Sequence, residues 1–81
     1  MNTIKSTYNE VCKRIFKEPL YFYESCEEMV FRTEPDFAND SYIKFAKCKG
    51  EHEFKAKKGS KVAFEAIYGA VLISKEDYDR Y

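Results

Sequence analysis

Two carboxylates and a lysine are the first residues whose types and spacing could do chemistry. Asp36 follows Pro35, and Glu53 lies two positions before Lys55. In metal-dependent cleavage of a phosphodiester, two carboxylates hold a hard divalent cation. A lysine beside them orients the attacking water or stabilises charge near the phosphate. This set of residues therefore raises the question of a small hydrolytic site.

The same residues satisfy the written form of the PD-(D/E)xK nuclease signature, so a small metal-dependent nuclease is one alternative. However, Glu53 follows a predicted turn, Lys49-Gly50-Glu51, where the nucleases use an apolar strand. A gapped three-residue pattern also arises easily in a chain whose residues are 35% charged. We therefore expect separate surface charges, with no catalytic residue, no metal and no cofactor, in a protein that is not an enzyme.

The single histidine and the three cysteines suggest no second site. His52 alternates with Phe54 in a predicted strand and has no orienting acid at a suitable spacing, so we expect a partly buried structural side chain. Cys12, Cys26 and Cys48 are odd in number and contain no C-x-x-C pair or zinc-ligand spacing. We expect reduced, half-buried thiols, with Cys12 in the core; one disulfide is the alternative. This cysteine usage and the lack of an apolar N-terminal segment predict a cytoplasmic protein.

The charges are ordered along the chain although they sum to zero, with 14 basic and 14 acidic residues. Residues 1–18 carry a net charge of +2, residues 19–40 carry −5, residues 41–62 carry +5 and residues 63–81 carry −2. The acidic block consists of Glu24, Glu27, Glu28, Glu34, Asp36 and Asp40. The basic block consists of Lys44, Lys47, Lys49, Lys55, Lys57, Lys58 and Lys61. Either the two blocks pair within the fold, or each presents a binding surface to a partner.

The basic block lies on a predicted hairpin, residues 44–61, that offers one alternative function. Lysines along such a hairpin can bind phosphates, and Tyr42 or Phe54 could stack on a base, so nucleic-acid binding is the second hypothesis. The use of lysine and not arginine disfavours reading of bases, because bidentate recognition of guanine favours arginine. A structural interpretation is that the lysines protect an edge strand from aggregation.

The hydrophobic pattern predicts an α+β fold in one domain spanning residues 1–81. An amphipathic helix is expected over the first seventeen residues, capped by Asn2 or Thr3, with one apolar stripe. That stripe comprises Ile4, Tyr8, Val11, Cys12, Ile15 and Phe16. Strands are expected near 20–24 and 29–33, although a single helix over 19–33 is an alternative, and residues 33–40 are expected to form a loop.

The second half of the chain is predicted to form a meander. Alternating residues predict strands at 42–48, 52–57 and 62–68, followed by the apolar run 70–73. Ser74 is the expected cap of a short C-terminal helix. The N-terminal helix would pack on this four- or five-stranded antiparallel sheet.

Residues 70–81, AVLISKEDYDRY, resemble the strand–cap–helix segment of Phd/YefM-type antitoxins. In that family the segment belongs to a DNA-binding, dimerising domain. The resemblance covers 12 of the 81 residues, and the preceding residues do not follow the family's pattern. The family's function is therefore not carried over to this chain.

These observations favour a small non-enzymatic interaction protein, of the accessory-inhibitor kind that phages and mobile elements encode, which blocks another macromolecule. The chain has seven tyrosines, and tyrosine is favoured at interfaces because it adds a polar group to a large contact area. We expect the partner to be a protein, with no membrane association; the sequence leaves the oligomeric state open, a dimer included. The candidate exposed tyrosines are Tyr21, Tyr23, Tyr42, Tyr78 and Tyr81.

Overall fold

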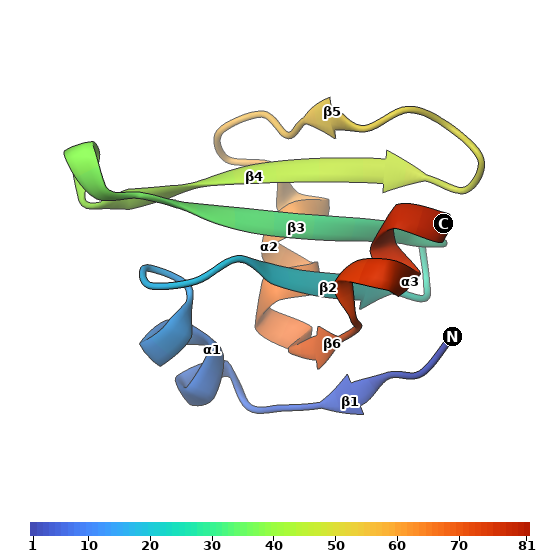
Figure 1. Ribbon diagram of the computed structural model, residues 1–81, viewed down its shortest axis with the longest axis horizontal. Helices are drawn as coiled ribbons and strands as arrows, with labels where there is room; N and C mark the ends of the chain where they lie inside the picture. The colour runs from blue at the N-terminus through green and yellow to red at the C-terminus, as the bar shows by residue number, and fades with distance from the viewer.

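A six-stranded antiparallel sheet forms the centre of the computed structural model, which describes all 81 residues (Figure 1). Its strands are β1 Ile4–Lys5, β2 Leu20–Glu24, β3 Met29–Asp36, β4 Ser41–Cys48, β5 Phe54–Lys55 and β6 Val71–Leu72. Their spatial order is β1-β6-β2-β3-β4-β5. The helices are α1 Tyr8–Arg14, α2 Lys61–Gly69 and α3 Lys75–Arg80, with a 3₁₀ turn, η1, at Phe37–Asn39. The α+β class expected from the sequence holds, with more strands and one more helix than predicted.

The strands β2, β3 and β4 form the meander at the centre of the sheet; the two strands expected near 20–24 and 29–33 are confirmed, and the alternative of a single helix over 19–33 is wrong. β3 and β4 pair along eight residues each, from Met29↔Cys48 to Asp36↔Ser41, so β3 enters the region where we predicted a loop. Pro35 fits there because β2 pairs with β3 only as far as Thr33. The missing N–H of proline therefore faces no neighbouring strand on that side.

The N-terminal helix is shorter than predicted. Thr7, and not Asn2 or Thr3, caps α1, its side chain accepting a hydrogen bond from the Glu10 N–H. Before this cap, Ile4 and Lys5 form the edge strand β1, in which Ile4 pairs with Leu72 of β6. The predicted apolar stripe is therefore divided between a strand and a helix.

Residues 61–69 form a helix, and the predicted strand at 62–68 is wrong. Ala63, Ala66, Ile67 and Ala70 recur at helical spacing and are all buried. The hydroxyl of Ser60 caps α2 by accepting from the Ala63 N–H, and alanine is the strongest helix former. The small alanine side chains let α2 lie close against the sheet. Ala70 ends the helix in the left-handed conformation, with φ of 55°.

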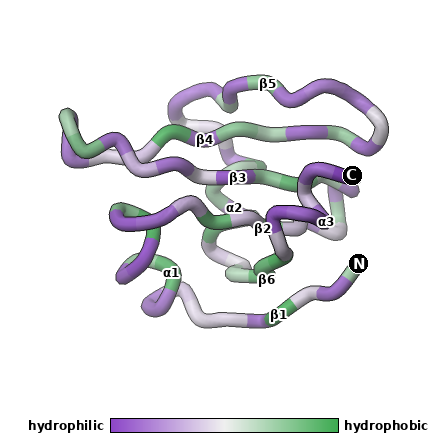
Figure 2. The backbone as a smooth tube through the Cα atoms, viewed as in Figure 1, coloured by the Kyte–Doolittle hydropathy of each residue, from purple (hydrophilic) through white to green (hydrophobic).

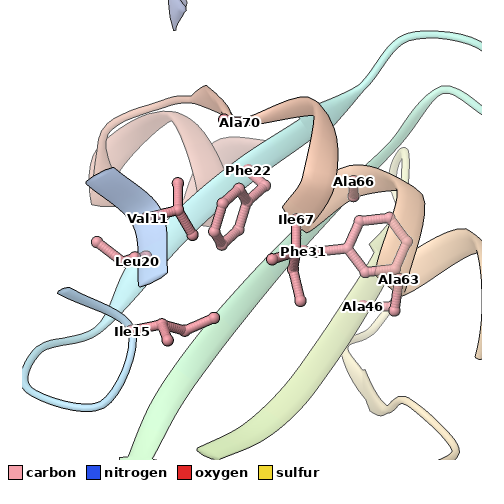
Figure 3. Packing of buried hydrophobic residues seen from close by; sticks show 10 residues of the cluster. All are labelled: Val11, Ile15, Leu20, Phe22, Phe31, Ala46, Ala63, Ala66, Ile67 and Ala70. Atoms are coloured by element: carbon pink, nitrogen blue, oxygen red, sulfur yellow. The ribbon is translucent and has the colours of Figure 1, made fainter. Parts of the chain in front are cut away.

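The main core lies between the sheet and the helices α1 and α2. Figure 3 shows Phe22 of β2 and Phe31 of β3 extending from the sheet toward the buried face of α2. Val11 and Ile15 of α1 cover the neighbouring part of the same face, and both are almost fully buried. Burying a side chain of this size contributes roughly 1.5–3 kcal/mol, so these rings and branched chains account for much of the fold's stability.

The opposite face of the sheet is covered at one end by α3 (Figure 1). The predicted Ser74 cap is confirmed, since the Ser74 hydroxyl accepts from the Asp77 N–H. Tyr78 of α3 packs against Val30 and Ile73 in a second, smaller cluster. None of the three α-helices is long and apolar enough to cross a membrane.

Candidate functional site

Five aromatic rings from α1, the turn after it, α2 and the start of β4 form two groups of ring contacts, and we call these residues the aromatic surface. They are Tyr8, Phe16, Tyr42, Phe64 and Tyr68. The ring centroids of Tyr8 and Tyr68 lie 5.0 Å apart and join the two helices. The ring centroids of Phe64 and Tyr68 lie 6.0 Å apart, and Phe16 makes an edge-on contact with Tyr42, at the start of β4, at 5.5 Å.

The aromatic surface follows directly from helical spacing. Phe64 and Tyr68 lie four residues apart on α2 and share one helix face, while Tyr8 is the first residue of α1 and Phe16 follows its last residue by two. The buried residues of each helix occupy the adjacent face. Each helix is therefore apolar over more of its circumference than the core covers, and the remaining rings are left at the surface.

Four of these five aromatic residues are exposed to solvent. The exposed fractions are 39% for Tyr8, 47% for Phe16, 56% for Phe64 and 60% for Tyr68. Since an aromatic side chain can bury roughly 150–250 Å², these fractions amount to about 400 Å² of exposed ring surface. Contiguous apolar patches of about 300–600 Å² are the largest that ordinary monomers carry, and they often mark interaction sites.

The aromatic surface also contains polar atoms, the hydroxyl groups of its tyrosines. The neighbouring Cys12 side chain raises the pKa of Tyr8, and the phenols of Tyr42 and Tyr68 act in the same direction. Burial raises the pKa of Tyr42, and Cys12 adds to that effect. These hydroxyls therefore stay neutral at physiological pH and can donate hydrogen bonds to a partner.

The structure contradicts several sequence-based predictions about exposure. Tyr78, predicted to be exposed, is 3% exposed, while Tyr21, Tyr23, Tyr42 and Tyr81 are half-buried. Predicted core members Tyr8, Cys12 and Phe16 are at the surface. All three cysteines are free thiols, but only Cys48 is half-buried, and His52 is exposed. The spacing of Tyr8, Cys12 and Phe16 was visible in the sequence; the error was to assign that whole stripe to the core.

The basic block does not pair with the acidic block. None of its seven lysines forms an ion pair within the fold. Lys47 donates to the backbone carbonyl of Asp79 and lies 5.2 Å from the ring centroid of Tyr78. Lys44, Lys55 and Lys58 line one surface hollow together. Figure 2 shows the chain from the end of β4 through β5 to α2 as mainly hydrophilic.

The acidic block is divided between the two ends of β3, so it does not form the single surface that its sequence suggested. Glu24, Glu27 and Glu28 lie at the turn between β2 and β3, whereas Asp36 and Asp40 lie at the turn that leads into β4. The eight residues of β3 separate these ends by about 26 Å. Glu34 pairs with Arg32 at 3.0 Å, and Asp36 accepts from the Asn39 amide. The two ends would therefore bind different parts of a partner.

Glu53 belongs to a structural network and not to a metal site. Its carboxylate accepts from Arg32 at 2.6 and 3.1 Å and from the Tyr78 hydroxyl at 2.5 Å. Arg32 in turn lies 3.9 Å from the ring centroid of Phe45. The guanidinium of Arg32 lowers the pKa of Glu53, and the Tyr78 hydroxyl adds to this effect.

Asp36 does not meet Glu53, and the residues of the nuclease signature are not brought together. Asp36 lies four residues along β3 from Arg32, a distance of about 13 Å, while Arg32 holds Glu53. The structure contains no group of three or more histidine, cysteine, aspartate or glutamate side chains placed to hold a metal ion. The arrangement of these residues does not favour the nuclease hypothesis.

Comparison of the chain with protein-family models, with curated proteins and with solved structures finds no significant match to any of them. These comparisons give no support to the likeness between residues 70–81 and an antitoxin segment. The aromatic surface and the unpaired lysines are the features from which a function must be inferred.

Proposed function

We propose that the protein is a small non-enzymatic interaction protein that binds another protein through its aromatic surface. The observation that carries this proposal is the cluster of Tyr8, Phe64 and Tyr68, in which the Tyr68 ring contacts both of the others and each residue is more than one third exposed. Exposing this area to water opposes folding and solubility unless a partner covers it. Tyrosine and phenylalanine are also the residues that interface centres favour.

The size of the aromatic surface suits the centre of a protein–protein interface. A standard interface buries about 800 Å² on each partner, and its centre is apolar while its rim is polar. The exposed rings supply about half of that area. Lys61 and Glu65 of α2 and Lys13 of α1 are exposed residues of the same two helices and supply charged positions for a rim. By covering a partner's own binding site with this surface, the protein would act as an inhibitor.

The lysines support nucleic-acid binding as a second candidate, because they are unpaired. However, the exposed rings of the aromatic surface lie on α1 and α2, and Phe54 is the one exposed ring among the lysine-rich residues 44–61. A protein that binds single strands usually places several rings along its basic groove. A protein partner is therefore the better interpretation of the aromatic surface.

Photo-crosslinking tests the proposal directly. Benzoylphenylalanine is introduced in place of Tyr68, and the protein is irradiated in cells of the organism that encodes it. Phe37 provides a matched control because it is 74% exposed but lies in η1, outside the aromatic surface. We expect a discrete protein adduct from position 68 that position 37 does not give. Equal labelling from both positions, or no adduct from position 68, would contradict the proposal.

A further inference from the structure

A lysine-lined hollow beneath β5 has the features of a small-molecule site. Its volume is about 490 Å³, within the range of roughly 300–1,000 Å³ that ligand pockets occupy. Met29, Phe31, Ala46 and Val62 supply apolar side chains to its lining. It lies on the face of the sheet that α1 and α2 cover, at the edge formed by β5. There β5 pairs with β4 through only two residue pairs.

The charges around this hollow all have one sign. Lys55, Lys57 and Lys58 line it, and no aspartate or glutamate does. These lysines form no ion pair with any carboxylate of the chain. Ser60, the cap of α2, also lines it, so the positive end of a nine-residue helix lies at the same place. An anionic group would be attracted to this rim.

The scarcity of polar side chains in the lining favours an anionic ligand whose remaining part is apolar. Apart from the lysines, Ser60 is the one polar side chain there, and its oxygen already accepts from the Ala63 N–H. A nucleobase buried in the hollow would leave several of its donors and acceptors without partners, which costs free energy. A hydrocarbon chain makes no such demand, and it would cover the exposed half of the Phe54 ring.

We propose that this hollow binds an anionic amphiphile with a single hydrocarbon chain, such as a fatty acid carboxylate or an alkyl phosphate. The chain lies over Phe31 and Val62, and the headgroup lies at Lys57 and Lys58. This site is separate from the aromatic surface, with which it shares no residue. Its existence does not depend on the protein partner.

Titration with dodecanoate below its micelle-forming concentration, followed by calorimetry and by backbone amide chemical shifts, tests the proposal. We expect saturable one-to-one binding, with the largest shift changes in residues 54–62. Dodecyltrimethylammonium has the same chain with a positive headgroup and should bind at least about tenfold more weakly. Acetate, which has the headgroup without the chain, should give no saturable binding.

Two sets of variants separate the headgroup from the chain. The double substitution Lys57→Glu with Lys58→Glu should weaken dodecanoate about tenfold, because each reversal removes an attraction and adds a repulsion. Lys49→Glu is the matched control, since Lys49 lies outside the hollow, and should change the affinity less than about twofold. Val62→Phe fills the hollow and should abolish binding, while an unchanged far-ultraviolet circular dichroism spectrum shows that the variant folds.

Three results would overturn the proposal. The first is binding of dodecyltrimethylammonium as tight as that of dodecanoate. The second is a set of shift changes centred on the aromatic surface, which would indicate that the chain simply covers exposed rings. The third is tighter binding of single-stranded oligothymidylate at the same lysines, which would assign the hollow to nucleic acid.

Discussion

Replacing Glu53 with glutamine removes the carboxylate that holds the segment before β5 against the sheet. β5 pairs with β4 through only two residue pairs, Phe45↔Lys55 and Ala46↔Phe54. Glu53 adds three hydrogen bonds, two from Arg32 and one from Tyr78. The Glu53→Gln variant keeps the shape of the side chain but loses its charge.

The magnitude of this change follows from the burial of the partners. The side chain of Glu53 is 32% exposed and that of Arg32 is 23% exposed, while Tyr78 is 3% exposed as a residue. Hydrogen bonds to charged groups contribute about 1.5–3 kcal/mol when they are shielded from water. Because solvent reaches Glu53, we expect a loss of about 2 kcal/mol in the free energy of unfolding. For a domain of this size that lowers Tm by about 8–16 °C.

Glu34→Gln is the matched control for this experiment. Glu34 pairs with the same guanidinium at 3.0 Å, but its side chain is 50% exposed. Such a pair contributes about 0.5 kcal/mol, so Tm should fall by less than about 4 °C. The assay is thermal unfolding followed by circular dichroism, with urea unfolding at neutral pH to measure the free energy directly.

The pH dependence gives an independent check on Glu53. Arg32 lowers the pKa of Glu53 below 4.5 in the folded protein. The contribution of the Glu53 carboxylate to the free energy of unfolding is therefore fully present above about pH 4.5. As the pH falls through the folded-state pKa, the carboxylate is protonated and the contribution is lost. The stability difference between the wild type and Glu53→Gln should therefore shrink in acid. A Glu53→Gln variant that is no less stable than Glu34→Gln at neutral pH would refute this reasoning.

Three further substitutions test other features of the fold. Thr33 is fully buried and its hydroxyl has no hydrogen-bond partner, so Thr33→Val should raise the free energy of unfolding in urea by about 1 kcal/mol; a loss would show a hidden partner. Glu28 has φ of 50°, so Glu28→Gly should be neutral or stabilising by about 0.5 kcal/mol, whereas Glu27→Gly in the same turn should destabilise. Burial raises the pKa of Tyr78, and the hydrogen bond from Tyr78 to Glu53 adds to this effect. The contribution of the neutral Tyr78 hydroxyl to the free energy of unfolding is therefore present below about pH 10 and is lost as the pH rises through the folded-state pKa. The urea midpoint should fall above about pH 10, and Tyr78→Phe should reduce that fall; an equal fall in both proteins would disprove the assignment to Tyr78.

Local signals were sufficient to predict the centre of the sheet and the last helix. The aromatic and β-branched residues at 20–24 and 29–33 predicted strands correctly, because these side chains pack well on a pleated surface. The Ser74 cap was equally clear, because it depends on one side chain and one nearby N–H. Features of this kind do not depend on the rest of the fold.

The errors arose where two periods fit the same residues. Val62, Phe64, Ala66 and Tyr68 alternate as in a strand, yet Ala63, Ala66, Ile67 and Ala70 also follow the helical period. The sheet decided between the two periods, since Phe22 and Phe31 are buried only because a closely packed helix covers that face of the sheet. The same ambiguity hid the aromatic surface: Phe64 and Tyr68 share a face in a strand and in a helix, but only the helix α2 places Tyr68 beside Tyr8 of α1.

Long-range pairing was the other property that local patterns did not predict. β1 and β6 come from opposite ends of the chain and pair through Ile4↔Leu72 and Lys5↔Val71. The partners of Glu53 likewise come from β3 and α3, 21 and 25 residues away. The charge blocks were visible in the sequence, but only their placement showed that the acidic block is divided and that the lysines are unpaired.

The most direct test of the proposed function is the affinity of the crosslinked partner for two variants that each lose one exposed ring. Tyr68→Ala removes a ring from the aromatic surface, and Phe37→Ala removes the isolated ring in η1. A ring at the centre of an interface contributes about 2 kcal/mol or more, so Tyr68→Ala should raise Kd at least about thirtyfold. Phe37→Ala should change Kd less than about twofold. Equal affinities for the two variants would contradict the assignment of partner binding to the aromatic surface.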